Sequence, residues 1–240
     1  MSVYVAFQIV LDAVGRSDVA NKVEHVKFGK IRSLSTRRGK TVFVDDMIRQ
    51  GIEISAQVLS STPTTKSDRQ LFPQIARQLA LSAFLINDFK RKRTTHYSYD
   101  WEKVLRSNKA NIGHLLQACH ARLCSLEEKF LNDDRNNVLL NLTDDFLTSK
   151  LVEPEALTLI DHLTKKSYES FETSIKQLDP SSIVSFLCDL AHSSNAAHKK
   201  LKILNVGDDL ANARLLLFSS ARMHLAYYLK ILGLDPIEKL

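Results

Sequence analysis

Apolar residues in the second half of the chain recur at the three- and four-residue spacing of one helix face. Pro154 lies where the first turn of a helix tolerates proline, and Gly233 is a typical helix stop. An earlier amphipathic stretch ends near the basic cluster 90–93, where cations complement a helix C-terminus. The helices predicted in this way cover residues 71–86, 112–130, 153–177, 181–204 and 210–232. The pattern therefore predicts a helix bundle.

The first fifty residues have a mixed pattern. An apolar helix is predicted for residues 3–14, ending at Gly15, and we expect it to be buried. Alternation at 23–28 and 41–44 is typical of β-strands. The cationic stretch 30–40 between them is expected to form the tip of a hairpin. This part of the chain therefore has the texture of an α/β fold.

Two polar stretches are predicted to be connections. Residues 60–67 are rich in Ser and Thr and contain a proline, which favours a linker or exposed loop. Residues 132–150 are rich in Asn and Asp, and we expect a mobile connection there.

The charge balance is moderately basic. The 240 residues include 33 Lys and Arg against 27 Asp and Glu, which gives a formal charge of +6. The isoelectric point is about 9.2. Such a balance suits a polyanionic partner, although many basic proteins simply carry a solvated cationic face.

The three cysteines argue against disulfides and metal sites, and the first apolar segment argues against a signal peptide or membrane span. Cys119, Cys124 and Cys188 are odd in number and lack a Cys-x-x-Cys spacing, so neither a disulfide framework nor a metal site is predicted. The apolar segment 3–11 is interrupted by Gln8 and lacks a basic leader, so we predict neither a signal peptide nor a membrane span.

Short motifs follow one another in an order that suggests a family. They are His25-Val-Lys-Phe-Gly29 with Leu34-Ser-Thr-Arg-Arg-Gly39, then Tyr97-Ser-Tyr-Asp-Trp101, then Gly113-His-Leu-Leu-Gln117 with His120-Ala-Arg122, then Asp179-Pro180, Ala213-Arg-Leu215 and Leu229-Lys-Ile-Leu-Gly233. In this order they resemble the C-terminal half of the class I arginyl-tRNA synthetases. The first pair resembles the KMSKS signature of that class, and the last group resembles the DALR anticodon-binding domain.

The resemblance implies a mainly α protein with two parts. Residues 1–106 would be the trailing fragment of a Rossmann-like α/β catalytic domain, with the KMSKS-like loop and connecting helices. Residues 107–240 would be an all-α anticodon-binding helix bundle. The implied family reaction is ATP-dependent ligation of arginine to its tRNA.

The resemblance also implies residues for ATP. Ser35, Thr36, Arg37 and Arg38 would be catalytic, because hydroxyl and guanidinium donors stabilise charge that develops on a leaving pyrophosphate. His25 and Gly29, together with Ser35 and Arg37, would bind the nucleotide. ATP with its Mg²⁺ is implied as a substrate, and no tightly bound cofactor is expected. From the sequence alone, a solvated basic hairpin would explain the same residues.

Anticodon recognition requires cations for the RNA backbone and surfaces for unstacked bases. The residues expected to bind tRNA are Lys90, Arg91, Gln117, His120, Arg122, Asn195, Arg214, Arg222 and Leu240. Arg122 and Arg214 could equally be structural and pair with carboxylates such as Glu127 or Asp209. At least one of the adjacent residues Tyr227 and Tyr228 is expected in the core.

The chain also departs from the family pattern. The HIGH motif and the arginine pocket are absent, Leu34 replaces the usual Met, and Ala197-His198 replaces a Phe-Tyr pair. We therefore expect this chain alone to be inactive. The alternative to a ligase component is a noncatalytic DALR-domain protein that binds tRNA, and a third possibility is a helical module that binds protein.

The expected partner is arginine tRNA, with ATP and arginine only where a full catalytic domain exists. We expect a monomer without a membrane partner. The segment around Cys119 resembles mitochondrial members of the family, which implies the mitochondrial matrix, with the cytoplasm as the alternative.

Overall fold

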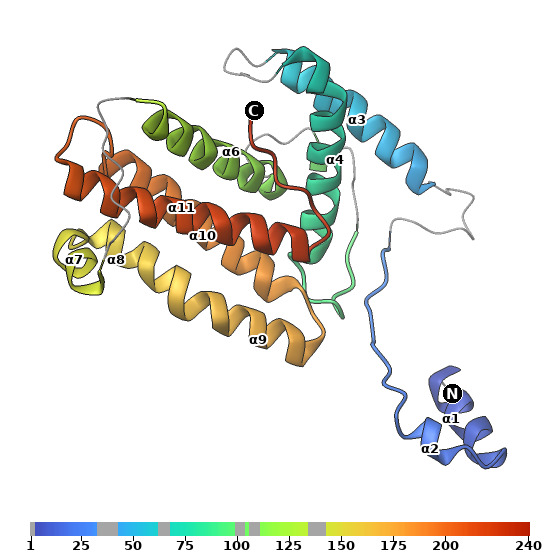
Figure 1. The fold of residues 1–240 in the computed structure, drawn as a ribbon. Helices are drawn as coiled ribbons and strands as arrows, with labels where there is room; N and C mark the ends of the chain where they lie inside the picture. Colours follow the sequence, from blue (N-terminus) through green and yellow to red (C-terminus); the bar gives the residue numbers. More distant parts are fainter. Residues whose placement is uncertain (1–2, 33–42, 62–67, 99–103, 106–110, 134–142) are drawn as a thin grey trace.

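The computed structural model describes residues 3–32, 43–61, 68–98, 104–105, 111–133 and 143–240, and within them the protein is mainly α-helical (Figure 1). The helices are α1 (Val3–Ala13), α2 (Ser17–Ala20), α3 (Val44–Ser61), α4 (Phe72–Phe89), α6 (Ile112–Leu131), α7 (Asp144–Lys150), α8 (Pro154–Asp161), α9 (Ser167–Gln177), α10 (Ser181–Lys200) and α11 (Asp208–Ile231). A 3₁₀ turn (Arg69–Leu71) precedes α4, and a π-helical turn (His162–Lys166) joins α8 to α9. The predicted mainly α fold is confirmed.

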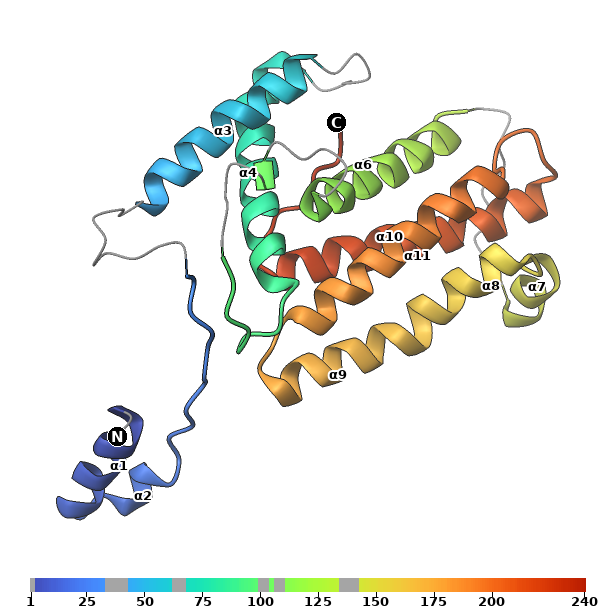
Figure 2. The same ribbon diagram turned by 180° about the vertical axis from the view of Figure 1, so that it is seen from behind.

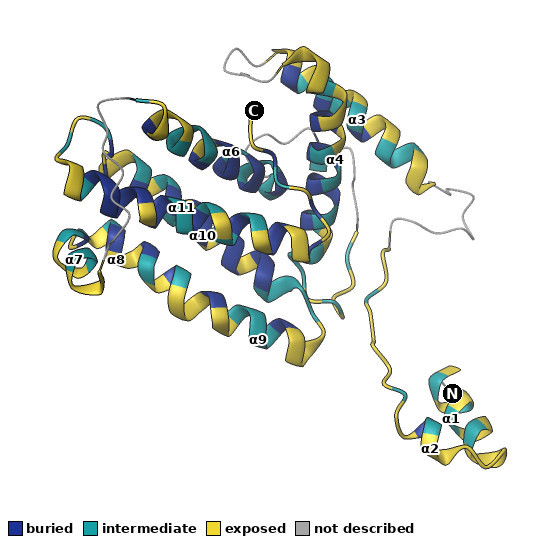
Figure 3. Cartoon of the chain, viewed as in Figure 1, coloured by how far each residue is buried: buried dark blue, intermediate teal, exposed yellow. Residues whose placement is uncertain are grey.

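The core of the bundle lies between α6, α8, α10 and α11 (Figure 3). Their inward faces carry large apolar side chains without solvent exposure, among them Leu116, Leu159, Leu187, Leu190 and Leu225. Burial of such side chains contributes about 1.5–3 kcal/mol each relative to leaving them exposed. The helices predicted from periodicity are therefore the ones that close the core.

Helices α8 and α9 cover residues that the pattern predicts as one helix. The helical path continues through the π turn, and Pro154 occupies the first turn of α8, as predicted. At the far end, α9 stops at Leu178, which has a left-handed φ of 48°. The carbonyls of this last turn are therefore available to partners outside the helix.

Helix α4 connects the bundle to α3, because it packs against both α3 and α6 (Figures 1 and 2). At the crossing with α6, a Cβ atom on Gly113 would lie 2.2 Å from the carbonyl oxygen of Ser82. A residue without a side chain is thus required for this close approach. The expected domain boundary between residues 106 and 107 falls at 106–110, outside the described residues.

The expectation that the first apolar helix is buried is wrong for this chain. Helix α1 forms as predicted, and Gly15 follows it with φ of 75°, but none of its residues is buried. Phe7 is 49% exposed and Val3 87%. Among the described helices only α2 packs against α1, and the pair lies away from the bundle in both views (Figures 1 and 2). An apolar sequence predicts a helix face that needs a partner, but does not supply the partner.

The predicted strands also require correction. Within the described ranges no strand forms, and the only β-type pairing is an isolated parallel bridge between Ile31 and Tyr97. The stretch 23–28 has no regular structure, and Val44 is the first residue of α3. Alternation indicates an extended chain, whereas a strand also needs a neighbour to pair with.

The expected connection 132–150 contains a helix. Thr143 accepts a hydrogen bond from the amide of Phe146 at 3.3 Å and so caps α7. Phe146 and Leu147 pack against the bundle core, which explains why a polar stretch folds here. The predicted linker 60–67 begins inside α3, and residues 62–67 lie outside the described residues.

Candidate functional site

Helix α6 carries three of the predicted tRNA-binding residues, Gln117, His120 and Arg122. It begins at Asn111, whose side chain accepts a hydrogen bond from the amide of His114 at 3.1 Å. Gln117 and His120 lie on its buried side, whereas Arg122 and Lys129 are exposed on the opposite side. The buried side chains of α6 therefore face the rest of the protein, whereas its exposed side chains are accessible from the solvent.

Gln117 is completely buried and holds the C-terminal segment of the chain. Its amide nitrogen donates to Ser82 Oγ at 2.9 Å and to the carbonyl of Asp235 at 3.0 Å. Its amide oxygen accepts from the backbone N–H of Ile237 at 2.8 Å. The structure thus places this predicted tRNA residue where every polar atom already has a partner inside the protein.

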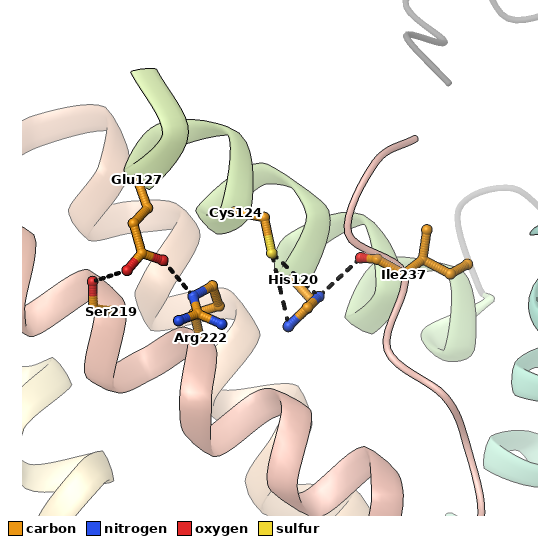
Figure 4. Close-up of polar contacts among 6 residues, drawn as sticks. All are labelled: His120, Cys124, Glu127, Ser219, Arg222 and Ile237. Carbon is orange, nitrogen blue, oxygen red and sulfur yellow. Dashed lines mark hydrogen bonds and ion pairs between the residues drawn. The ribbon is translucent and has the colours of Figure 1, made fainter. Parts of the chain in front are cut away.

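His120 makes the second contact to the same segment (Figure 4). Its Nδ1 lies 2.8 Å from the carbonyl oxygen of Ile237 and 3.7 Å from the sulfur of Cys124. Burial lowers the pKa of His120, which favours the neutral ring. With only 2% of its surface exposed, His120 positions the C-terminal segment rather than reaching a ligand directly.

Arg222 on α11 pairs with Glu127 on α6 (Figure 4). Its Nε donates to Glu127 Oε2 at 2.5 Å, and Ser219 Oγ donates to the other carboxylate oxygen at 3.0 Å. The carboxylate therefore bridges two residues one turn apart on α11. Glu127, expected as a possible partner of Arg122, serves Arg222 instead.

Arg214 is also a structural residue by its contacts. It is 9% exposed, donates to the carbonyl of Lys202 at 2.8 Å and forms an ion pair with Glu153. Partial burial alone would raise the pKa of Glu153, but the hydrogen bond and charge of Arg214, together with hydrogen bonds from the backbone, outweigh this effect and the pKa lies below its usual range. Asp209, the partner expected from the sequence, pairs with Lys150.

Arg122 and Asn195 are brought together on the outside of the bundle. The guanidinium of Arg122 donates to Asn195 Oδ1 across the α6–α10 contact, and Arg122 remains exposed. Burial lowers the pKa of the neighbouring His198, and the positive charges of Arg122 and Lys129 lower it further. We call Arg122, Lys129, Asn195 and His198 the α6–α10 cationic surface. Its exposed cations, Arg122 and Lys129, carry positive charge that attracts polyanions.

A hollow of about 380 Å³ adjoins this surface at Lys129. It is lined by Ser125, Glu128, Lys129, Asn132, Lys239 and Leu240. Lys239 pairs with Glu128 at 2.8 Å, which fixes the C-terminal segment on α6 beside the hollow. The structure thus places Leu240 near the cationic surface. Lys129 was not predicted, although its position seven residues after Arg122 on one helix face could have indicated it.

Lys90 and Arg91 lie elsewhere, at the end of α4. Partial burial lowers the pKa of Lys90, and the charge of Arg91 lowers it further. The guanidinium of Arg91 lies over the ring of Tyr97 at 4.6 Å from its centroid and donates to the carbonyl of Asn87. Arg91 is therefore engaged within the junction between α4 and the segment that follows it, and Lys90 is partly buried there.

Only two of the predicted ATP residues fall within the described ranges. The ring of His25 stacks on Tyr4, with 5.0 Å between centroids and 17° between planes. Gly29 donates its N–H to the carbonyl of Arg93 at 2.7 Å. Ser35, Thr36, Arg37 and Arg38 lie outside the described residues.

The described part of the chain shows neither a metal-binding cluster nor a membrane-spanning helix. There, no group of three or more His, Cys, Asp or Glu side chains is placed to hold a metal ion. None of the helices in these ranges has the length and hydrophobicity to cross a membrane.

Tyr228 is buried while Tyr227 is 58% exposed, so one of the pair is in the core, as predicted.

Comparison with known families matches both parts of the chain. The family of the DALR anticodon binding domain matches residues 116–240. The family described as tRNA synthetases class I (R), catalytic domain, matches residues 2–101. Residues 102–115 lie between the two matches.

Known relatives carry the name arginine--tRNA ligase. The probable mitochondrial enzyme of Mus musculus is 35% identical over 226 residues, which are 92% of this chain and 36% of that protein. The enzyme of Encephalitozoon cuniculi is 37% identical over 228 residues, 92% of this chain and 38% of that protein. The probable cytoplasmic enzyme of Dictyostelium discoideum is 32% identical over 237 residues, 98% and 38% respectively. The chain thus spans 36–38% of the length of these relatives.

Solved structures show the same fold. The arginyl-tRNA synthetase of Thermus thermophilus has a TM-score of 0.76 at 21% identity, covering 100% of this chain and 39% of that one. The enzyme of Plasmodium falciparum has a TM-score of 0.75 at 23% identity, covering 98% and 39%. The chain belongs to the arginyl-tRNA synthetase family and carries the DALR anticodon-binding domain of that family in its second half.

Proposed function

We propose that this chain holds arginine tRNA by its anticodon arm, as the C-terminal part of an arginine--tRNA ligase. The observation that carries the proposal is the α6–α10 cationic surface, which lies within the region matched by the anticodon-binding family. A guanidinium whose direction is fixed by Asn195 and which stays exposed is suited to a phosphate or a base edge. The hollow beside Lys129 and Leu240 offers room next to it for an unstacked base.

The buried predicted residues take an indirect part in this function. Gln117 and His120 hold the segment that ends at Leu240, and we assign them the positioning of that segment. Arg214 and Arg222 hold α11 against its neighbours through Glu153 and Glu127. Direct contact with RNA is assigned to Arg122, Lys129, Asn195 and Leu240.

Filter binding of the 240-residue chain to arginine tRNA tests the proposal. Arg122→Ala should weaken binding about tenfold and reduce the slope of log affinity against log salt by about 0.7–0.9, because a contact to the RNA backbone is lost. Arg77→Ala, which removes an equally exposed arginine from α4, is the matched control and should change affinity less than about twofold. Equal losses in the two variants, or equal affinity for a tRNA with another anticodon, would contradict the proposal.

The catalytic part of the function rests on the family. Ser35, Thr36, Arg37 and Arg38 are proposed to contact the triphosphate of Mg²⁺-bound ATP, with His25 and Gly29 at the base of the same loop. These residues supply donors for the pyrophosphate, whereas the family's HIGH motif is not part of this sequence. We therefore expect the chain alone to show no arginine-dependent exchange of pyrophosphate into ATP. Measurable exchange would show that it is catalytically sufficient.

The alternative is a noncatalytic DALR-domain protein that binds tRNA. It shares the α6–α10 cationic surface with the ligase component and differs in having no use for ATP. Adding the upstream catalytic segment of a relative in trans separates the two, because only a ligase component would restore charging. A monomer in the mitochondrial matrix is proposed, with the cytoplasm as the alternative, since the relatives include enzymes named for both compartments.

A further inference from the structure

Arg93 connects two segments that are far apart in the sequence. Its Nε donates to the carbonyl of Leu178 at 3.0 Å, and one terminal nitrogen donates to the carbonyl of Gln177 at 3.2 Å. The other terminal nitrogen donates to the carbonyl of Lys27. One guanidinium thus bonds the end of α9 and the segment that leads into the predicted ATP loop.

The α9 side of this contact is chemically favourable. The last carbonyls of a helix have no partner within the helix and carry partial negative charge, so a cation there is stabilised. The main chain of Arg93 binds the same turn, because its N–H donates to Asp179 Oδ2 at 2.9 Å. The other oxygen of Asp179 accepts from the N–H of Ser181, the first residue of α10, at 2.9 Å. Arg93 is therefore fixed to the α9–α10 turn by both its backbone and its side chain.

The other side of the contact is a close backbone pairing. Segment 27–32 runs beside segment 93–97, with Gly29 N–H bonded to the Arg93 carbonyl at 2.7 Å and Arg32 N–H bonded to the Tyr97 carbonyl at 2.8 Å. A Cβ atom on Gly29 would lie 2.0 Å from the carbonyl oxygen of Thr95. Only glycine permits this approach.

We propose that Arg93 is a positioning residue that fixes segment 27–32 on the α9–α10 turn, so that a displacement of α10 reaches the start of the predicted ATP loop. Helix α10 is a single helix of 20 residues with the turn at its first residue and Asn195 near its last. A ligand that displaces α10 at Asn195, or reduces its motion there, therefore also affects the α9–α10 turn. The hydrogen bonds of Arg93 then transmit this displacement or restriction to Lys27. The functional consequence rests on the proposed function, because it assumes tRNA at the α6–α10 cationic surface.

Hydrogen–deuterium exchange of the free chain tests the connection without tRNA. In Arg93→Gln, amides of segment 27–32 and of the α9–α10 turn should both exchange about tenfold faster, because charge-assisted bonds to three carbonyls are lost. Lys92→Gln removes the same charge from the exposed neighbouring residue and is the matched control, for which exchange should not change. Arg93→Lys keeps the charge but has one nitrogen in place of three, so it should resemble Arg93→Gln.

The second measurement adds arginine tRNA to the same proteins. In the wild-type chain, bound tRNA should slow exchange in segment 27–32, whereas in Arg93→Gln it should slow exchange in α10 only, with affinity unchanged. Gly29→Ala provides an independent variant, because it separates segments 27–32 and 93–97 while leaving Arg93 on the turn, and it should abolish the same response.

The outcomes distinguish the two proposals. Absence of tRNA binding would defeat the proposed function, while the exchange rates of the free chain still test the connection. Full protection of segment 27–32 in Arg93→Gln would overturn the positioning role. Restoration of protection by Arg93→Lys would also overturn it, since positive charge rather than geometry would then be sufficient.

Discussion

The bundle and the amino-terminal helix pair both contain helices with apolar side chains, but these side chains are buried in the bundle and exposed in the pair. Phe218 of α11 is 2% exposed and belongs to the bundle core, whereas Phe7 of α1 is 49% exposed. Both lie in helices that the apolar pattern predicts. The difference shows that periodicity determines whether a helix forms, while burial depends on whether another element covers its apolar face.

The largest expected effect tests this difference with one substitution made in both regions. Phe218→Ala should lower the free energy of unfolding by about 3–5 kcal/mol, because it leaves a cavity in a closed core. Phe7→Ala should lower it by less than about 1 kcal/mol, because the side chain is already half in water. Urea unfolding followed by circular dichroism measures both, and similar losses would mean that α1 is packed in solution.

A second prediction compares two arginines within the bundle. Arg214→Ala should cost about 2–3 kcal/mol of stability, because it leaves the partly buried carboxylate of Glu153 without its partner. Arg122→Ala should cost less than about 0.5 kcal/mol, since this exposed side chain holds no buried charge. Thermal unfolding of the two variants gives the values. If Arg122→Ala were the more damaging, its assignment to RNA contact would fail.

The smallest expected effect concerns pH. Since the pKa of Glu153 is lowered in the folded protein, its carboxylate contributes stability above the ordinary value of 4.5, and this contribution is lost as the pH falls below that value. The difference in melting temperature between the wild type and Glu153→Gln should therefore be largest near neutral pH and shrink in acid. A difference that grows as the pH falls would contradict the ion pair.

Much of the helical architecture could be predicted from sequence. The apolar spacing in α4, α6, α10 and α11 is strong, and Pro154 and Gly233 act at the ends that they predict. Helix α3 was missed, although Ile48, Ile52 and Leu59 recur at the spacing of one helix face. Two of the three residues that it buries are the small Gly51 and Ser55, which carry little apolar signal in the sequence. Helix α7 was missed because its Asn- and Asp-rich surroundings conceal the two side chains that pack on the core.

The sequence predicted which helices carry the candidate site, but it did not predict which of their polar side chains are exposed. The motifs pointed to α6 and α10, and the Arg122–Asn195 pair joins two of the expected residues. Gln117 and Arg214 are of the residue types that bind RNA, yet both are buried with partners inside the protein. Sequence does not tell which side of a helix faces water when polar and apolar residues share the inner side. Arg93 was passed over because its partners lie 66 and about 85 residues away.

The packing of Ile237 has a consequence for the time course of folding during synthesis. Ile237 is 3% exposed in a small apolar cluster with Leu59, Ile75 and Leu79, which belong to α3 and α4. At about 5–20 residues per second, a ribosome needs roughly ten to thirty seconds to advance from Ile75 to Ile237. Throughout that interval the apolar surface of α3 and α4 lacks its cover, and a chaperone that recognises exposed aliphatic side chains has that long to bind it.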